Sequence, residues 1–392
     1  MADYLLYPTT AAGGVIAANE PLLKENIEDE IINLFPDELV LQLFLPNKPS
    51  MQTWGEQPVD TINNVTRTNA VLALGDDEVV KEEYSTATLQ AATFGHKIRY
   101  VTEIHQTAFG VSGTSIQAST YGFANRQDYE AMKIAKQQML DFELRCWFAP
   151  GSNPAGQEIP PATGTPAAWS NPNTPLNRRQ TQGLFHWITN GGIERGNGLT
   201  ASKWNYHGEV LKSGTQDYRT WAYNANGLPL TADMWTNKLL TPWSQIAKGV
   251  TQNTVAFMSN KARMLFRTFA LPAAGAVNTR TIAAGERKIV DAVDIYETDA
   301  GKVAIKGSYY LNVAGQTATV NLTGPTQLSC AWDEMVLVIN PEGYCIRTYR
   351  PQQAHMLGRT KDGEEMMYVM EKGLQCRSPF YGAGIVNCVA AA

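Results

Sequence analysis

The sequence is poor in charge, has no excess of cations and lacks long apolar runs. Charged residues make up 18% of its 392 residues, below the roughly 25% of an average soluble protein. Lys and Arg number 32 and Asp and Glu 37, a net charge of −5, which argues against a strongly basic nucleic-acid-binding protein. No apolar run reaches the roughly 18 residues of a membrane span. No Lys or Arg precedes Lys24, so the start of the chain lacks the charged region of a secretory signal. We expect a soluble, globular protein without membrane contact.

Cysteine and histidine are too sparse and scattered to indicate a metal site. The five cysteines include no C-x-x-C pair, although zinc sites usually need such close pairs. The five histidines form no H-E-x-x-H or H-x-H pair. We predict reduced, structural thiols, no metal and no cofactor, as suits an intracellular assembly site. The cysteines are Cys146, Cys330, Cys345, Cys376 and Cys388.

Motifs of catalysis are also missing. Gly110–Gly113 (G-V-S-G) falls short of the nucleophile motif G-x-S-x-G, and the glycines at 191–198 match neither a dinucleotide fingerprint nor a P-loop. The many carboxylates and nine Trp would allow a sugar-cleaving acid/base pair, but aromatic residues more often fill cores and subunit interfaces. We predict no catalytic residue and a structural role, with a carbohydrate-active hydrolase as an alternative.

Negative charge is concentrated at the start of the chain. Residues 1–60 hold ten acids and two lysines, a net of −8, so that the other 332 residues sum to +3. Three adjacent acids, Glu28, Asp29 and Glu30, lie among isoleucines. Two interpretations stay open: a solvated helix face, or an acidic arm that lies on a basic surface of another subunit.

Residues 51–104 are predicted to be extended. Two sets of side chains alternate here, with the period of a strand that has unlike faces: Ile98, Tyr100, Thr102 and Ile104 against Arg99, Val101 and Glu103. His105 continues this strand as a half-buried polar partner. An acidic stretch precedes it, made of Asp76, Asp77, Glu78, Glu82 and Glu83. A hairpin with so few large apolar residues cannot form its own core, so it must rest on another surface.

Residues 126–148 are predicted to form the longest helix. Asn125 is a favourable N-cap, with Asp128 three residues later. At about 1.5 Å per residue the helix is a rod of roughly 35 Å, and it ends before Pro150. Apolar residues recur at spacings of three and four residues and form one stripe: Met132, Ala135, Met139, Phe142 and Cys146.

The rest of the chain combines loops, helices and strands in the order of an α+β fold. Residues 150–175 contain seven of the 20 prolines, which predicts a surface loop. Helices are predicted at 231–248 and 259–269. The predicted strands are Ile289–Tyr296, Val303–Leu311, Met335–Ile339, Tyr344–Tyr349, Met366–Met370 and Leu374–Arg377.

Four local patterns follow one another along the chain. They are Phe109–Thr114 ahead of the long helix, Arg178–Leu184 with Trp187–Asn190, Val293–Tyr296 with Asp299–Val303, and Trp332–Asp333 through Leu357–Gly363 and Glu371–Leu374. In this order and spacing they resemble the major capsid (major head) proteins of tailed bacteriophages with the Hong Kong 97-type fold. The likeness runs from about residue 26 to 388.

The resemblance implies a division of the chain. It gives an N-terminal arm (1–50), an extended loop (51–100), a peripheral domain with a spine helix at 126–148 (101–190), an axial domain (191–288), and strands that complete both domains (289–392). Residues 150–175 and the Thr- and Gln-rich stretch 316–329 are expected to be insertions. Two roles stay open for each: contact with a decoration protein, or a simple lengthening of the shell surface.

The resemblance also implies a function. Identical chains would assemble as hexamers and pentamers into an icosahedral shell around double-stranded DNA, with the packaged DNA bound only weakly. The other partners would be a portal protein and a scaffold or decoration protein; the protein would be assembled in the host bacterial cytoplasm and belong to the virion. A related compartment-forming shell and a tail or baseplate protein are alternatives. Inter-subunit contacts are predicted at Glu28, Asp29, Glu30, Trp54, Asp76, Asp77, Glu78, Glu82 and Glu83.

Overall fold

The computed structural model describes most of the chain from Leu39 onward. The described residues are 39–59, 96–117, 126–152, 178–198, 205–206, 209–210, 212–213, 216–217, 219–246, 253–270, 295–298, 301–321, 327–358 and 362–388. Both the arm before residue 39 and the acidic stretch 76–83 lie outside them, as does most of the proline-rich loop 150–175.

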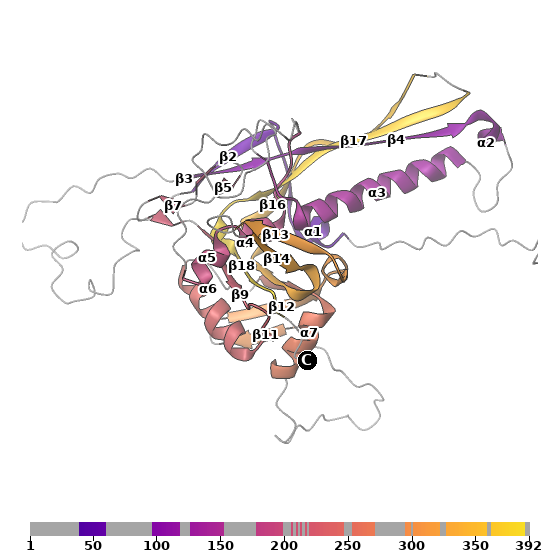
Figure 1. The fold of residues 1–392 in the computed structure, drawn as a ribbon. Coiled ribbons are helices and arrows are strands. Elements are labelled where there is room, and N and C mark those ends of the chain that lie inside the picture. Colours follow the sequence, from indigo (N-terminus) through magenta and orange to yellow (C-terminus); the bar gives the residue numbers. More distant parts are fainter. Residues whose placement is uncertain are drawn as a thin grey trace, which may run out of the picture.

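A six-stranded sheet forms the centre of the body (Figure 1). Its order is β11-β12-β10-β15-β18-β9, with β10–β12 and β18–β9 parallel and the other pairs antiparallel. Every residue of β10, β15 and β18 is buried, because both faces of the sheet are covered. The strands are β9 (Trp221–Asn224), β10 (Thr254–Met258), β11 (Ile295–Thr298), β12 (Gly301–Gly307), β15 (Val336–Ile339) and β18 (Gly382–Val386).

The alternation of side chains along these strands supplies two hydrophobic cores. Val336 and Val338 of β15 face a cluster that includes the π-helical turn η4 (Met234–Leu240), α6 (Thr241–Ile246) and α7 (Asn260–Ala270). Leu337 and Ile339 face the opposite cluster, which includes α3 (Arg126–Phe148) and α4 (Leu184–Thr189). The helices predicted at 231–248 and 259–269 are confirmed, and they cover one face of this sheet.

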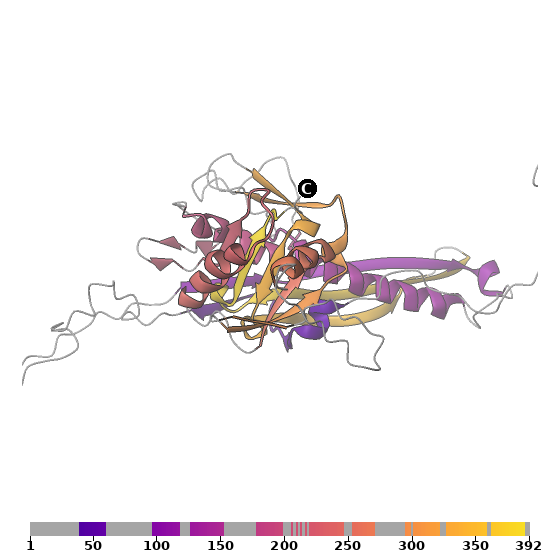
Figure 2. The ribbon, with the colours of Figure 1, turned by 90° about the horizontal axis from the view of Figure 1, so that it is seen from below.

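A second, four-stranded sheet extends away from the body. Its order is β1-β16-β17-β4, and α3 runs alongside its long strands in both views (Figures 1 and 2). The C-terminal strands thus contribute to both sheets. The strands are β1 (Asn47–Pro49), β4 (Glu103–Ser112), β16 (Tyr344–Met356) and β17 (Gly363–Cys376), and the short helix α2 (Gly113–Gln117) follows β4.

The remaining elements are short. The β2–β3 ribbon is antiparallel, and so are the hairpins β5–β6, β7–β8 and β13–β14. The short helices are α1 (Val40–Phe44) and α5 (Gly192–Gly196), and the 3-10 turns are η5 (Tyr310–Asn312), η6 (Trp332–Glu334), η7 (Pro341–Gly343) and η8 (Pro379–Tyr381). The short strands are β2 (Trp54–Val59), β3 (His96–Val101), β5 (Asn205–Tyr206), β6 (Glu209–Val210), β7 (Lys212–Ser213), β8 (Gln216–Asp217), β13 (Thr317–Asn321) and β14 (Gln327–Ala331).

The long helix has the predicted bounds, but its predicted stripe is only half buried. Phe142 and Cys146 are fully buried, whereas Met132 is 71% exposed. Gln138 and Glu143 are buried instead. The prediction of one apolar stripe was wrong in this respect. The surfaces that meet the helix present main-chain N–H and C=O groups, and the side chains of Gln138 and Glu143 form hydrogen bonds with them.

The predicted alternation at 98–104 changes phase within the segment. Ile98, Tyr100 and Thr102 are buried as predicted, but Ile104 is exposed and Glu103 is buried. The chain leaves one ribbon and enters another sheet between β3 and β4, with Thr102 in neither strand. A single strand over this whole range was therefore a wrong prediction.

Several predicted strands differ in extent. Met366–Met370 and most of Leu374–Arg377 belong to one strand, β17, which ends at Cys376, and Tyr344–Tyr349 is the start of a longer β16. The Val303–Leu311 strand ends at Gly307. The stretch 316–329, predicted as an insertion, lies largely in the β13–β14 hairpin, whose Ala318, Val320 and Cys330 belong to the core.

Candidate assembly surface

Two joints connect the body to the segments predicted to reach other subunits. One is the root of the N-terminal arm, formed by α1 and β1. The other is the root of the extended loop, formed by β2, β3 and Thr102. A buried carboxylate lies at each joint, and a third, at the start of β4, contacts Arg145 near the end of the spine helix α3.

At the arm joint, α1 is fixed to α3 by the carboxylate of Glu143. Its Oε1 accepts the main-chain N–H of Leu41 (2.6 Å) and the indole N–H of Trp147 (3.1 Å), and its Oε2 accepts the main-chain N–H of Gln42 (3.1 Å). The side-chain amide of Gln42 donates to the carbonyl oxygen of Met139. The first turn of α1 has N–H groups without intrahelical partners, and Glu143 satisfies two of them.

Apolar contacts complete this joint. Leu41 and Leu45 are buried in the core, and the ring of Phe44 meets that of Phe257 edge to face at 5.7 Å between centroids. β1 then pairs in parallel with β16. Residues 40–49 are therefore part of the folded body.

Burial raises the pKa of Glu143 above its ordinary value, although the N–H donors from Leu41, Gln42 and Trp147 act in the opposite direction. The ionised carboxylate of Glu143 accepts all three N–H groups. These hydrogen bonds offset part of the cost of removing its charge from water.

At the extended-loop joint, Thr102 and Gly373 hold the ribbon against β17. Both the main-chain N–H (2.9 Å) and the hydroxyl oxygen (2.8 Å) of Thr102 contact the carbonyl oxygen of Thr53. The hydroxyl also lies 3.1 Å from Oε1 of Glu371. The chain crosses Gly373 so closely that a side chain there would overlap the carbonyl oxygen of Val101.

Glu371 is nearly fully buried and holds two arginines at this joint. Arg179 donates to its Oε1 (2.7 Å) and Arg350 to its Oε2 (3.1 Å). Arg179 comes from the segment before α4 and Arg350 from β16, so the carboxylate ties three separate parts of the chain together. Arg350 remains partly exposed.

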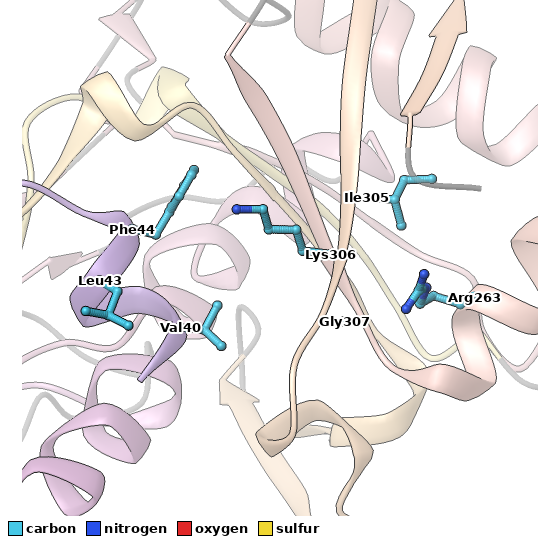
Figure 3. Close-up of a pocket in the computed structure, with 7 residues that line it drawn as sticks. All are labelled: Val40, Leu43, Phe44, Arg263, Ile305, Lys306 and Gly307. Atoms are coloured by element: carbon cyan, nitrogen blue, oxygen red, sulfur yellow. The ribbon is translucent and has the colours of Figure 1, made fainter. Parts of the chain in front are cut away.

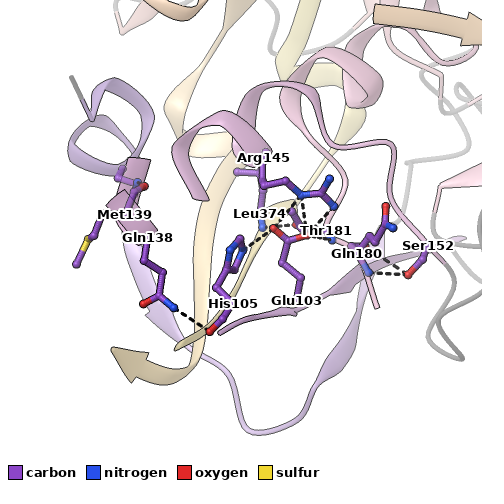
Figure 4. A network of polar contacts seen from close by, with 10 residues as sticks. Glu103, His105, Gln138, Met139, Arg145, Ser152, Gln180, Thr181 and Leu374 are labelled. Carbon is purple, nitrogen blue, oxygen red and sulfur yellow. Dashed lines mark hydrogen bonds and ion pairs between the residues drawn. The ribbon is translucent and has the colours of Figure 1, made fainter. Parts of the chain in front are cut away.

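The third carboxylate is Glu103, whose register with Lys372 places it on the face of the sheet opposite Glu371. Figure 4 shows its polar contacts. Its oxygens contact Nε2 of His105 (2.7 Å), Nη2 of Arg145 (3.0 Å) and the main-chain N–H of Thr181 (3.1 Å). Burial alone would raise the pKa of Glu103, but the hydrogen bond from His105 and the charge and hydrogen bonds of Arg145 outweigh it and hold the pKa below its usual value. His105 is thus the polar partner that the sequence predicts.

Polar side chains continue this network along α3. The amide of Gln138 donates to the carbonyl oxygens of His105 (2.9 Å) and Tyr368 (3.2 Å), on β4 and β17 respectively (Figure 4 shows the first of these bonds). Gln352 of β16 donates to Oε1 of Gln138. These bonds hold the helix on the long strands where few apolar residues are available.

Of the predicted inter-subunit residues, the structure describes only Trp54. It lies half-buried in β2, and the guanidinium carbon of Arg99 lies 5.8 Å from its ring centroid. Lys97 and Arg99 also pair with Glu56 across the ribbon. The others lie outside the described residues: Glu28, Asp29, Glu30, Asp76, Asp77, Glu78, Glu82 and Glu83.

All five cysteines are buried and unpaired as disulfides. Burial raises the pKa of the thiols of Cys330 and Cys388 to about 12. Within the described part of the chain, no group of three His, Cys, Asp or Glu side chains could hold a metal ion, and no helix is both long and apolar enough to span a membrane.

Sequence reasoning missed Glu103, Glu143 and Glu371 as the centres of these joints. The only available signal was position: Glu143 lies near the end of a helix between Phe142 and Cys146, where an acid interrupts an apolar stripe. Their partners lie from 2 to 269 residues away along the chain, and no local pattern reveals such pairs.

Two solved capsid structures share this fold. The chain matches the capsid of an empty GTA particle (11% identity, TM-score 0.53, covering 97% of this chain and 100% of that one). It also matches the capsid of the cyanophage P-SCSP1u (10% identity, TM-score 0.51, covering 95% and 94%). No curated protein matches the sequence. The two-sheet body with its spine helix is thus the Hong Kong 97-type capsid fold, and the α+β prediction is confirmed.

The family follows from the sequence itself. The family model described as SU10 major capsid protein matches residues 8–388. The chain belongs to this family of major capsid proteins, so it is a structural protein of a capsid shell and its place is the virion.

Proposed function

We propose that copies of this chain assemble as hexamers and pentamers into a closed icosahedral shell around double-stranded DNA, in the cytoplasm of a host bacterium and without enzymatic activity. Membership of the major capsid family supports self-assembly. The proposed partners beyond other copies are a portal protein and a scaffold or decoration protein, with weak contact to the DNA.

One structural observation carries the proposal. Both predicted reaching segments are rigidly held at their roots, by Glu143 for the arm and by Thr102 and Gly373 for the extended loop. A long segment with a fixed root leaves the body in a defined direction, which suits contact with neighbours in a shell. Many modest interfaces repeated around a closed shell add to a large collective stability.

The division into arm, extended loop, peripheral domain and axial domain remains part of the proposal. The test of the arm must respect its root: removal of residues 1–50 would also remove Leu41 and Leu45 from the core. The informative truncation ends at residue 38, so that α1 and β1 remain.

We expect the truncated chain to stay folded, with the far-UV circular dichroism and melting temperature of the full chain, while closed particles are lost. Electron microscopy and sedimentation of both proteins measure this. Normal shells from the truncated chain would show that the arm is dispensable and would overturn its proposed role.

A further inference from the structure

A groove opens between the arm root and the edge of the six-stranded sheet (Figure 3). Its volume is about 520 Å³. The side chains come from α1, α7 and β12, so the groove joins the first described helix to the body. It is lined by Val40, Leu43, Phe44, Arg263, Ile305, Lys306 and Gly307.

The lining is apolar on one side and cationic on the other. Leu43 is 84% exposed, which is unusual for a leucine on a helix that otherwise packs on the core. Nζ of Lys306 lies 4.8 Å from the ring centroid of Phe44, and Arg263 contributes the second cation. None of the seven lining residues is acidic. The complementary ligand is a segment with carboxylates and branched apolar side chains.

The chain itself contains such a segment. Residues 25–32 read Glu-Asn-Ile-Glu-Asp-Glu-Ile-Ile, with four acids and three isoleucines in eight residues and no cation. The other acidic stretch, residues 76–83, includes Lys81 and has smaller valines, so it fits the two cations and the apolar wall less well.

We propose that this groove receives residues 25–32 of a neighbouring copy of the chain. The inference rests on the proposed function, because it needs a second subunit held nearby in a shell. A neighbouring copy is favoured over the same subunit because Val40 is itself part of the groove wall. The segment of the same chain would have to reverse direction within residues 33–39, whereas a neighbour's segment can enter freely.

Complementary charge reversals test the inference. One variant carries Lys306→Glu and Arg263→Glu, and the other carries Glu28→Lys, Asp29→Lys and Glu30→Lys. Each variant alone should lower the yield of closed particles at least tenfold, because like charges then meet in every contact. All five changes combined in one chain should restore particles, since every arm then again meets a groove of opposite charge.

Controls separate docking from folding. Lys302→Glu changes an exposed lysine on the same strand outside the groove and should leave the particle yield unchanged. If the Lys306/Arg263 variant melts at a lower temperature than the wild type, Leu43→Asp replaces it, because that side chain is exposed and bears little on folding.

The outcomes are distinct. Particles at wild-type yield from either single variant would overturn the docking. To distinguish the two sources of the segment, one cysteine is placed on each surface (Glu28→Cys and Leu43→Cys). A disulfide formed within one chain, and not between chains, would place the segment in its own subunit and overturn the neighbour contact. Failure of the wild type to assemble, even with a scaffold protein, would instead contradict the proposed function.

Discussion

The carboxylate oxygen Oε1 of Glu143, in the spine helix, lies 2.6 Å from the main-chain nitrogen of Leu41, in the first turn of α1. This contact joins residues 102 positions apart and fixes α1, the first described helix, to the spine helix. A second oxygen of the same carboxylate accepts the next N–H, from Gln42. The spine helix therefore both supports the long sheet and anchors α1, from which the proposed arm would extend.

Replacement of Glu143 by Gln should loosen the arm root. An amide presents its NH₂ group to one of the N–H donors, so at least one hydrogen bond is lost and a buried N–H remains unsatisfied. We expect a loss of about 1–3 kcal/mol in the free energy of unfolding and faster amide hydrogen exchange at Leu41 and Gln42. Glu130→Gln, a change at a partly exposed acid on the same helix, serves as the control; equal exchange in the two variants would contradict the role of Glu143.

Replacement of Gly373 by Ala should displace the root of the extended loop. The new Cβ would overlap the carbonyl oxygen of Val101, so either the ribbon or β17 must move, at a cost of about 1–3 kcal/mol. Gly358→Ala is the matched control, since no atom lies within 4 Å of a Cβ there. Urea denaturation of both variants measures the difference. Equal stability of the two would mean that the crossing is not tight.

Replacement of Glu103 by Gln should destabilise the base of the spine helix, because Arg145 keeps its charge and loses its carboxylate. We expect a loss of about 3 kcal/mol. Since the pKa of Glu103 is lowered in the folded protein, its contribution is present above the unfolded value and is lost as the pH falls through the folded pKa. A double-mutant cycle with Arg145→Met should give a coupling of about 1–3 kcal/mol; a coupling near zero would contradict the pairing.

His186 should make the protein less stable in mild acid. Burial in α4 lowers its pKa from 6.5 to about 4. Below pH 6.5 the unfolded chain binds a proton that the folded chain does not, so stability falls until about pH 4 and this contribution is constant below that. The full effect is about 3 kcal/mol. Urea denaturation of the dilute, unassembled subunit between pH 7 and pH 4 should show a steeper loss for the wild type than for His186→Gln; parallel curves would contradict this assignment.

Local sequence patterns predicted the helices and strands of this fold better than they predicted which elements pack or pair with one another. The sequence of the helix at 126–148 has a residue favoured at N-caps before its start and a proline beyond its end, and both bounds are confirmed. The strand β10 was missed because Thr254–Met258 is buried on both faces, and a short run without alternation has no strand period. The distal part of β16 was missed because it contains Pro351 and polar residues, and its pairing with β17 alone makes it a strand.

The joints could not be predicted because their polar groups are matched across the whole chain. Glu371 meets Arg179 and Thr102, which are 192 and 269 residues away. In the sequence, an Asp or Glu that will be buried looks the same as one that stays in water. It can be recognised as buried only when the positions of its hydrogen-bond and ion-pair partners in the fold are known. The resemblance to capsid proteins supplied the fold and the function that composition alone left open.

The most direct test of self-assembly is sedimentation velocity combined with negative-stain electron microscopy of the full chain, expressed alone and with a scaffold protein. We expect closed polyhedral particles, or hexamers and pentamers that convert to them. A compact monomer that persists at high concentration under both conditions would contradict assembly by this chain into a shell.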